Sequence, residues 1–419
     1  MNRPTGMPAR GNPSIDARLK LSPPGGEDRT GTTVAPLAKS ILFVDDDNDV
    51  LGGLRNLLRA RRREWDMVFV NSGESAVALL NTRSFDVVVS DMRMPKMDGA
   101  TLLQIVKERN PGAIRIILTG QTELDAAMKT VSVAHQFLAK PCEAEQLQQV
   151  VRRACDLSQL LCSEELRSVV GGIAHLPSAP QTYVALAALL ATPNASLEEV
   201  ARVIESDVAM CAKILQLVNS AFFGVSRRII NVLEAATYLG TLMIRNLALS
   251  MGAFAALEGT NRGIAAAAES LRAHSILTAQ MARAMFKDKR KAEDAFMAGM
   301  LHGIGHLIAL AYLDPQATAS VRPALLGAYL LGLWGIPYPV VEAVAHHDQP
   351  ERIEHAEFDL PDAVYLAHHL AGETAPAPDV DPTVPHRIDL EHLQRVGVSP
   401  AQVAVWRRST EEAIRGGTA

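Results

Sequence analysis

The stretch FDVVVSDMRMPKMDG, residues 85–99, joins a short apolar run to a polar loop. Its three consecutive valines are typical of a strand that is buried on both faces of a parallel sheet. We therefore expect a strand over Asp86–Ser90. Asp91 follows directly, so its carboxylate is expected at the carboxyl end of that strand, where ligands bind in open parallel sheets.

Four more apolar runs flank this stretch and alternate with amphipathic segments. The runs predict strands over Ile41–Val44, Met67–Val70, Ile114–Leu118 and Gln136–Leu138. The other segments predict helices over Val50–Arg63, Gly73–Asn81, Thr101–Arg109, Glu123–Val131 and Glu143–Leu161. Parallel neighbouring strands need right-handed helical crossovers. The alternation therefore predicts an α/β doubly wound, five-stranded parallel sheet.

Polar residues stand at the carboxyl ends of four predicted strands. Asp45 and Asp46 follow the first strand, Asp91 the third, Thr119 the fourth and Lys140 the fifth. Three carboxylates suit Mg²⁺, which prefers oxygen ligands and keeps several waters. A hydroxyl and an ammonium group opposite them suit a phosphoryl group carried by one carboxylate. A single aspartate at a strand end is usually a loop cap, but five suitable residues in order favour a site.

These residues and their surroundings resemble the receiver domain of two-component response regulators. The matching stretches are Ile41–Asp47, Phe85–Gly99, Leu118–Gly120 and Phe137–Pro141. The resemblance implies a flavodoxin-like fold in which Asp91 is the phosphoacceptor. A sensor histidine kinase or a phosphotransfer protein would then be the phosphoryl donor.

The same resemblance implies roles for the neighbouring residues. Mg²⁺ would be held by Asp45, Asp46, Asp91 and the backbone carbonyl of Arg93. Lys140 would pair with the phosphoryl oxygens. Thr119 would move to hydrogen-bond them, and Phe137 stands where the family keeps its switch aromatic.

The pattern changes after the fifth predicted helix. Alanine- and leucine-rich segments recur at helical spacing, and no strand pattern appears. We expect a receiver over residues 40–155, a linker helix over 156–165 and an all-α, HD-like domain over 166–371. Residues 1–39 have the composition of a disordered leader, and residues 372–419 that of a linker with a helix over Pro400–Ile414. The uncharged stretch Pro323–Val341 is broken by glycines and prolines, so we interpret it as a buried helix and a turn.

Composition narrows the class of protein. The chain has 419 residues, of which 48% are hydrophobic and 21% charged, as in a globular protein of two or three domains. A net charge of −5 argues against coating nucleic acid or an anionic membrane. Four cysteines without a CxxC pair fit a reducing compartment. We therefore expect a cytoplasmic protein.

Histidines gather in the helical part, where eight of the twelve lie between residues 274 and 369. Imidazole is a ligand for transition metals, so the candidate ligands are His274, His302, His346, His347 and His368. Their order looks like the HD phosphohydrolase scaffold. However, Gly303 follows His302 where that superfamily has the aspartate that bridges two metals. We expect these histidines to be packing residues, and a transition-metal ion is the less favoured alternative.

The preceding stretches are similar to the HDOD domain, a non-catalytic relative of the HD enzymes. They are Leu176–Pro177, Val203–Asp207, Lys213–Gly224 and Ala235–Gly240. The resemblance implies an output domain that binds a downstream signalling protein under the control of Asp91. The alternative is a phosphorylation-controlled, metal-dependent HD phosphohydrolase or cyclic-dinucleotide phosphodiesterase, from which Gly303 departs.

Two further patterns leave alternatives open. Residues 197–217 have a helix-turn-helix rhythm, but the second helix offers only Lys213 and Gln216 for reading DNA, so we expect no direct nucleic-acid partner. In the fifth predicted helix, apolar residues recur at three- and four-residue spacing from Leu147 to Leu161. That face is suited either to core packing or to a homodimer seam.

Overall fold

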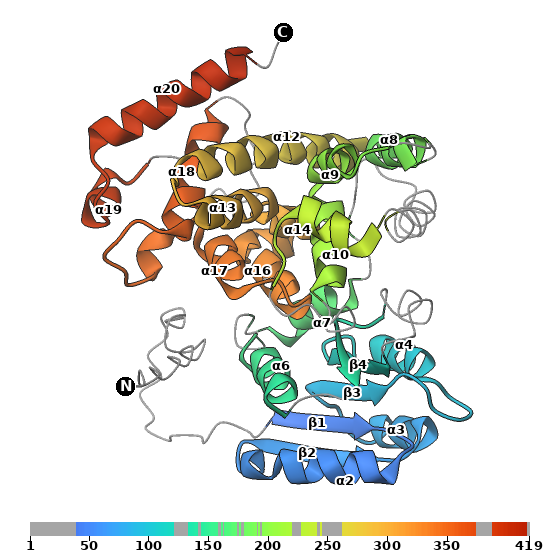
Figure 1. Cartoon of the computed structure of the whole chain (residues 1–419). Coiled ribbons are helices and arrows are strands. Elements are labelled where there is room, and N and C mark those ends of the chain that lie inside the picture. Colours follow the sequence, from blue (N-terminus) through green and yellow to red (C-terminus); the bar gives the residue numbers. More distant parts are fainter. Residues whose placement is uncertain are drawn as a thin grey trace, which may run out of the picture.

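A computed structural model of the chain places a parallel sheet at one end of the molecule and a helical domain at the other (Figure 1). It describes residues 39–120, 133–140, 144–157, 161, 163–173, 176, 180–190, 192, 195–219, 228–240, 244, 262–373 and 388–416. The leader expected over residues 1–39 lies outside the described residues, apart from Lys39, which begins the first strand. Most of the expected linker after residue 372 also lies outside them.

The five predicted strands form one parallel sheet in the order β2-β1-β3-β4-β5. The strands are β1 (Lys39–Val44), β2 (Trp65–Val70), β3 (Val87–Asp91), β4 (Ile114–Gly120) and β5 (Gln136–Lys140). The middle strand β3 is buried along its whole length, as its run of valines predicts. The predicted doubly wound fold is therefore confirmed.

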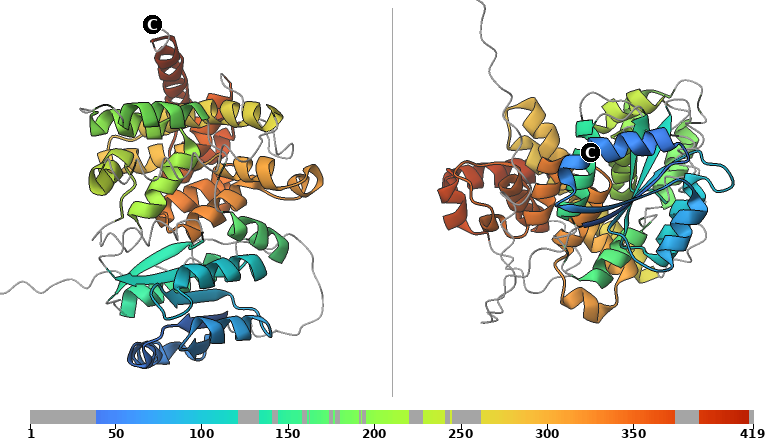
Figure 2. Two further views of the ribbon diagram at one scale, coloured as in Figure 1. Left: turned by 90° about the vertical axis from the view of Figure 1, so that its right-hand side faces the viewer. Right: turned by 90° about the horizontal axis from the view of Figure 1, so that it is seen from below.

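Helices cover both faces of the sheet (Figure 2). They are α2 (Asn48–Leu57), α3 (Gly73–Leu80), α4 (Gly99–Arg109) and α6 (Ala144–Leu157). The first helix is shorter than predicted, because it ends at Leu57 and a 3₁₀ turn, η1 (Arg59–Arg61), follows. Helix α4 begins two residues early, because Asp98 caps it by accepting a hydrogen bond from the Thr101 N–H. The helix expected over Glu123–Val131 lies outside the described residues.

The apolar face of α6 is used within the chain. Its apolar positions between Leu147 and Leu157 are buried, and the Leu157 side chain lies against Gly332 of the helical domain. Of the two alternatives for this face, the structure shows core packing. The linker helix expected over residues 156–165 is instead two helices, because α6 ends at Leu157 and α7 (Glu164–Gly172) begins after Ser163, whose hydroxyl caps it.

The second domain is helical in every regular element that the structure describes between residues 164 and 416. Its helices after α7 are α8 (Pro180–Leu190), α9 (Leu197–Glu205), α10 (Val208–Val218), α12 (Arg262–Ala284), α13 (Lys289–Leu301), α14 (Ile304–Tyr312), α15 (Pro315–Ala319), α16 (Pro323–Leu333), α17 (Tyr338–His346), η3 (Pro350–Arg352), α18 (Leu360–Gly372), α19 (Leu390–Arg395) and α20 (Pro400–Gly416). The expected C-terminal helix is present as α20, and α19 is an addition that the sequence did not predict.

Apolar helices form the centre of this domain. Helix α12 packs against α13 and α18, and α16 packs against α14 and α17. The segment Lys289–Tyr312 is long and apolar enough to cross a membrane, but 83% of its most apolar window is buried inside the protein. It is therefore placed as a core segment. The uncharged stretch after Pro323 is the buried helix α16, which ends in a turn where Gly335 has a φ of 74°.

The two domains are joined by a buried guanidinium group. Arg115, near the amino end of β4, is 1% exposed and donates to the carbonyls of Val133, Pro111 and Ala113 at 2.6–3.1 Å. Its Nη2 also donates to the carbonyl of Gly171 in α7 at 2.6 Å. Burial lowers the pKa of Arg115 to about 9. The charge is held by carbonyl dipoles from both sides of the domain boundary.

His135, directly before β5, extends this interface. Its Nε2 lies 3.0 Å from the Gly171 carbonyl, and its own carbonyl accepts a hydrogen bond from Gln216 of α10 at 3.1 Å. Arg153 of α6 donates to the carbonyl of Ile336. The amino ends of β4 and β5 are thus attached to α7 and α10.

Replacing Gly171 by alanine should weaken this interface. The added Cβ would lie 2.4 Å from the Pro111 carbonyl oxygen, so backbone would have to move. We expect the free energy of unfolding, measured in urea, to fall by about 1–3 kcal/mol, the usual cost of overpacking. Gly172→Ala is the matched control, because its Cβ would meet only the Pro111 Cβ at 3.7 Å. Equal losses in the two variants would contradict this account.

Candidate functional site

The carboxyl edge of the sheet brings the predicted polar residues together. The register pairs Asp91 with Leu118, and Thr119 and Gly120 with Ala139 and Lys140. Asp45 follows β1, which pairs with β3 from Ile41 to Val44. Because the strands are parallel, their polar ends meet at one edge. Asp45, Asp91 and Thr119 are buried, whereas Asp46 is exposed.

The loop after Asp91 holds its carboxylate from the backbone side. The Arg93 N–H donates to Asp91 Oδ2 at 2.9 Å. Gly99 begins α4 directly against this loop, and a Cβ there would lie 2.1 Å from the Asp91 carbonyl oxygen. Glycine is therefore required at residue 99 for α4 to start at this place.

Lys140 connects two of the carboxylates. Its Nζ lies 2.7 Å from Asp45 Oδ2 and forms a short ion pair with Asp91 Oδ1. Burial would lower the pKa of Lys140, but its bonds to Asp45 and Asp91 raise it overall. Burial raises the pKa of Asp91, and Lys140 opposes that shift. The arrangement keeps a carboxylate beside a firmly protonated ammonium group.

The donor set of this edge fits Mg²⁺. Asp45, Asp46 and Asp91 can each direct a carboxylate oxygen so that these atoms lie within 4.8 Å of one another. All three are hard oxygen ligands, and the exposure of Asp46 leaves a side for water. Arg93 contributes its N–H to Asp91, and the role expected of its carbonyl stays a prediction.

The two expected switch residues share one face of the sheet. Ile117 pairs with Phe137, and Thr119 pairs with Ala139. Since side chains alternate along a strand, Thr119 and Phe137 are diagonal neighbours on the same face. Thr119 is 1% exposed and Phe137 is 2% exposed, so the aromatic ring is already buried in this structure.

Three of the candidate histidines converge in the helical domain. His274 of α12, His302 after α13 and His368 of α18 direct ring nitrogens toward one point, within 4.8 Å of one another. The Nδ1 of His368 lies 2.9 Å from the Nε2 of His274 and 3.1 Å from the Nε2 of His302. The ring of His347 is 4.9 Å from that of His302. His346 does not take part, and both of its ring nitrogens are buried without a hydrogen-bond partner.

The hydrogen bonds fix where protons lie in this cluster. His302 Nδ1 donates to the Gly299 carbonyl at 2.6 Å, and His347 Nδ1 donates to the Val344 carbonyl at 2.8 Å. The Nε2 of each neutral ring therefore carries a lone pair. Burial, reinforced by the neighbouring rings, holds the pKa of His302 and His368 well below the usual value. His302, His347 and His368 are therefore neutral imidazoles.

No carboxylate belongs to this group in the described residues. Gly303 stands where the HD pattern has its bridging aspartate. A Cβ on Gly303 would lie 2.9 Å from Leu271 Cδ1 and 2.9 Å from Ser275 Oγ, so these two side chains of α12 would have to turn away from it.

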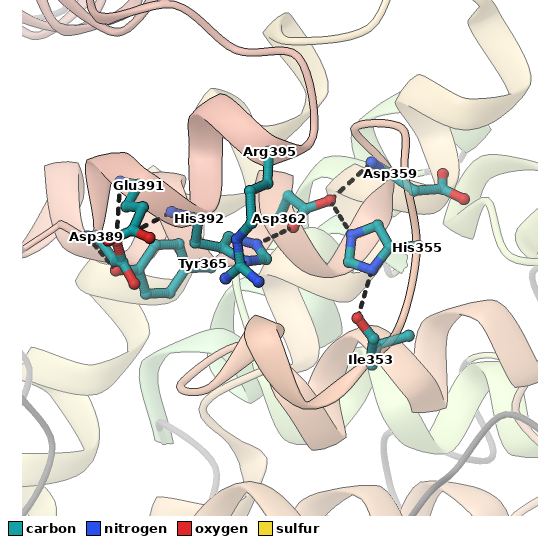
Figure 3. A network of polar contacts seen from close by, with 9 residues as sticks. All are labelled: Ile353, His355, Asp359, Asp362, Tyr365, Asp389, Glu391, His392 and Arg395. Carbon is teal, nitrogen blue, oxygen red and sulfur yellow. Dashed lines mark hydrogen bonds and ion pairs between the residues drawn. The ribbon is translucent and has the colours of Figure 1, made fainter.

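A third polar group was missed from the sequence. Asp362, at the start of α18, contacts His355 and His392, and these three can also direct ligand atoms to within 4.8 Å of one another (Figure 3). His355 and Asp362 lie seven residues apart across a loop, and His392 lies thirty residues further on, so no spacing pattern links them. The cap signal of Asp359 and Asp362 before α18 is the only local sign.

Comparisons with known proteins agree with both halves of the chain. The family model described as response regulator receiver domain matches residues 41–152, and the HDOD domain model matches residues 176–324. An uncharacterized protein of Treponema pallidum is 26% identical over 211 residues, which are 45% of this chain and 40% of that protein. The response regulator protein FleR of Pseudomonas aeruginosa is 32% identical over 162 residues, 38% of this chain and 33% of FleR.

Among solved structures, the signal receiver domain of an HD domain-containing protein from Pseudomonas fluorescens Pf-5 is 30% identical. It covers 29% of this chain and 98% of its own, with a TM-score of 0.28. The chain spans less than half the length of the two curated relatives above. The sheet with its acidic edge and the two family models show that the chain contains a response regulator receiver domain followed by an HDOD domain.

Replacing Lys140 by methionine should raise the pKa of Asp91 further. The ammonium group lowers that pKa through a hydrogen bond and through its charge, and methionine removes both. The Asp91 carboxyl carbon can be followed by NMR titration of the metal-free protein. Lys39→Met is the control, because Lys39 pairs with Asp86 at the opposite end of β1. An unchanged or lowered pKa in the Lys140 variant would contradict the assignment.

Proposed function

We propose that Asp91 accepts a phosphoryl group from a sensor histidine kinase or a phosphotransfer protein, and that this controls the HDOD domain. The observation that carries the proposal is the contact of the Asp91 carboxylate with Lys140 at the carboxyl edge of the sheet. A carboxylate oxygen of Asp91 forms a bond to phosphorus while the bond from phosphorus to the donor nitrogen breaks. The nitrogen keeps the electron pair.

Residues around Asp91 are placed to hold the charge of this group. Asp45, Asp46 and Asp91 would hold Mg²⁺, which when bound neutralises negative charge on a transferring phosphoryl group. Lys140 can exchange its contact with Asp91 for one with a phosphoryl oxygen while it keeps Asp45. The Thr119 hydroxyl, which donates to the Gly120 carbonyl at 3.4 Å, can turn to donate to a phosphoryl oxygen instead.

We infer that the helical domain is a binding module and not a hydrolase. Among the residues that the structure describes, the converging histidines include no carboxylate to bridge two metal ions or to act as a general base. Gly303, which stands where the HD pattern has its bridging aspartate, supports this inference. The output would then be contact with a downstream signalling protein.

The structure also supports the inference that the output does not read DNA directly. Lys213 and Gln216, the candidate base-reading residues, are 4% and 2% exposed. Lys213 lies over the ring of Trp334 at 4.9 Å, and Gln216 bonds to His135 of the receiver. Neither side chain can reach a groove while the domains are joined. A protein partner and a cytoplasmic location remain our proposal for this regulator.

A second candidate function of the helical domain is the binding of one transition-metal ion. The Nδ1 of His368 faces the Nε2 of His274 and the Nε2 of His302. One proton on this nitrogen can form a hydrogen bond with only one of the two. The carbonyl of Gly299 orients the His302 ring in the way that carbonyls orient metal-ligating histidines. An ion held by His274, His302 and His368 would fasten α12 and α18 to the end of α13.

Asp91→Asn should reduce labelling by a small phosphodonor such as acetyl phosphate to background, because the amide is not the required nucleophile. Labelling of the wild type should also vanish when EDTA removes Mg²⁺. Asp86→Asn is the control, since Asp86 precedes the same strand but pairs with Lys39 at its other end. Wild-type labelling of the Asp91 variant would overturn the proposal.

The full chain should hydrolyse neither cyclic dinucleotides nor phosphomonoesters when Mg²⁺, Mn²⁺ or Fe²⁺ is supplied. Metal analysis should find at most one transition-metal ion at the cluster, and the double variant His302→Ala, His368→Ala should lose it. His306→Ala, outside the converging set, is the control. Metal-dependent turnover that disappears in the double variant would favour the phosphohydrolase alternative.

A further inference from the structure

The carboxylate of Asp362 is buried and held by three donors (Figure 3). It has no exposed side-chain surface, and it accepts hydrogen bonds from His355 Nε2 at 2.7 Å and His392 Nε2 at 2.7 Å. The Asp359 N–H donates to it at 2.9 Å. A buried carboxylate is costly without such partners. Asp362 therefore anchors the two segments that carry these histidines, the loop before α18 and helix α19.

The hydrogen-bond partners of His355 and His392 favour different protonation states of the two rings. His355 faces an acceptor at each nitrogen, because Nδ1 lies 2.9 Å from the Ile353 carbonyl and Nε2 faces Asp362. Only the doubly protonated ring satisfies both contacts. His392 Nδ1 instead lies 3.4 Å from the guanidinium of Arg395, which is a donor, so a neutral ring protonated at Nε2 fits there.

The network fastens the C-terminal segment, residues 388–416, to the body of the helical domain. His392 lies on α19, whereas Asp362 lies on α18, and the matched HDOD region ends at residue 324. Asp389 adds a backbone bond from its N–H to the Tyr365 hydroxyl at 2.7 Å. Trp406 of α20 stacks on Phe358 with ring centroids 5.5 Å apart. The segment thus covers an apolar surface and is held beside it by polar bonds.

The charged groups around His355 favour its protonated form. Asp362 and Asp359 at the start of α18 both face it, and Asp359 is shared with Lys291 of α13 at 3.1 Å. From α19, the ring of His392 lies 5.9 Å away and Arg395 lies behind that ring. His355 keeps 18% of its side chain exposed, so water can deliver and remove its proton.

We propose that His355, Asp362 and His392 form a proton-controlled latch, in which loss of one proton from His355 loosens the C-terminal segment from α18. When that proton leaves, His355 must give up its bond to Ile353 or its bond to Asp362.

The sign of the pH dependence follows from the contacts. The hydrogen bond with Asp362 raises the pKa of His355 against the opposing effect of burial. The latch therefore stabilises the closed segment fully below the ordinary histidine pKa of about 6.5, and this stabilisation is lost as pH rises through the raised value. Burial would raise the pKa of Asp362, but the two histidines lower it overall, so the carboxylate stays ionised throughout this range.

Hydrogen exchange of the full chain tests the latch. Between the ordinary and the raised pKa, the opening equilibrium should grow by up to about tenfold per pH unit for one proton. After correction for intrinsic exchange, protection of residues 390–396 should therefore fall as pH rises from 6 to 9. His355→Gln keeps a donor for Asp362 but does not titrate, so its protection should not change with pH. Asp362→Asn should lower protection most at pH 6.

Arg407→Gln is the matched control. It removes the exposed pair between α20 and Glu373, measured at 2.8 Å, and should loosen the segment equally at every pH. The same pH-dependent loss in wild type and His355→Gln would overturn the proposal. So would Zn²⁺ that restores protection at pH 8.5 in wild type but not in Asp362→Asn, because the group would then be a metal site.

Discussion

The contact on which the arrangement of the two domains depends is that of the buried Arg115 guanidinium with the Gly171 carbonyl. Arg115 stands near the amino end of β4, and Thr119 stands near its carboxyl end, four residues or about 13 Å along the strand. His135 directly precedes β5, and Lys140 is the last residue of that strand. Two adjacent strands therefore run from the acidic edge to the domain boundary. We propose that a shift at Thr119 reaches α7 along β4, because packed interiors are not continuously deformable.

In the helical domain, Gly303 stands beside the histidine cluster, where the HD pattern has an aspartate. A Cβ there would meet the side-chain ends of Leu271 and Ser275 on α12, both at 2.9 Å. The neighbouring histidines keep converging nitrogens, but burial keeps them neutral. Such a cluster can fasten helices, with or without a metal ion, and the described residues give it no carboxylate with which to activate water. Our proposal therefore gives the domain a binding role, regulated by the receiver and by the C-terminal segment.

Sequence reasoning found the sheet and the acidic edge because parallel strands bring their carboxyl ends together, so order along the chain translates into proximity. It could not find the contacts that join the two domains. Arginine and histidine are usually exposed to solvent, and Arg115 and His135 are buried here because α7 and α10 pack against them. Lys213 was interpreted as a side chain available for DNA for the same reason. The Asp362 network was missed because its members come from a loop and two helices, where partners are set by tertiary packing and not by a repeat.

The most direct test of the coupling between the domains is hydrogen exchange with and without beryllofluoride, which mimics a phosphoryl group on Asp91. The amides to follow are those of Glu164–Gly172 in α7 and Val208–Val218 in α10, which meet the receiver at Gly171 and Gln216. We expect their exchange to change on addition of the mimic, and the change to be blunted in Thr119→Ala. If beryllofluoride binds and both helices nevertheless exchange at the same rates with and without it, the domains are only tethered.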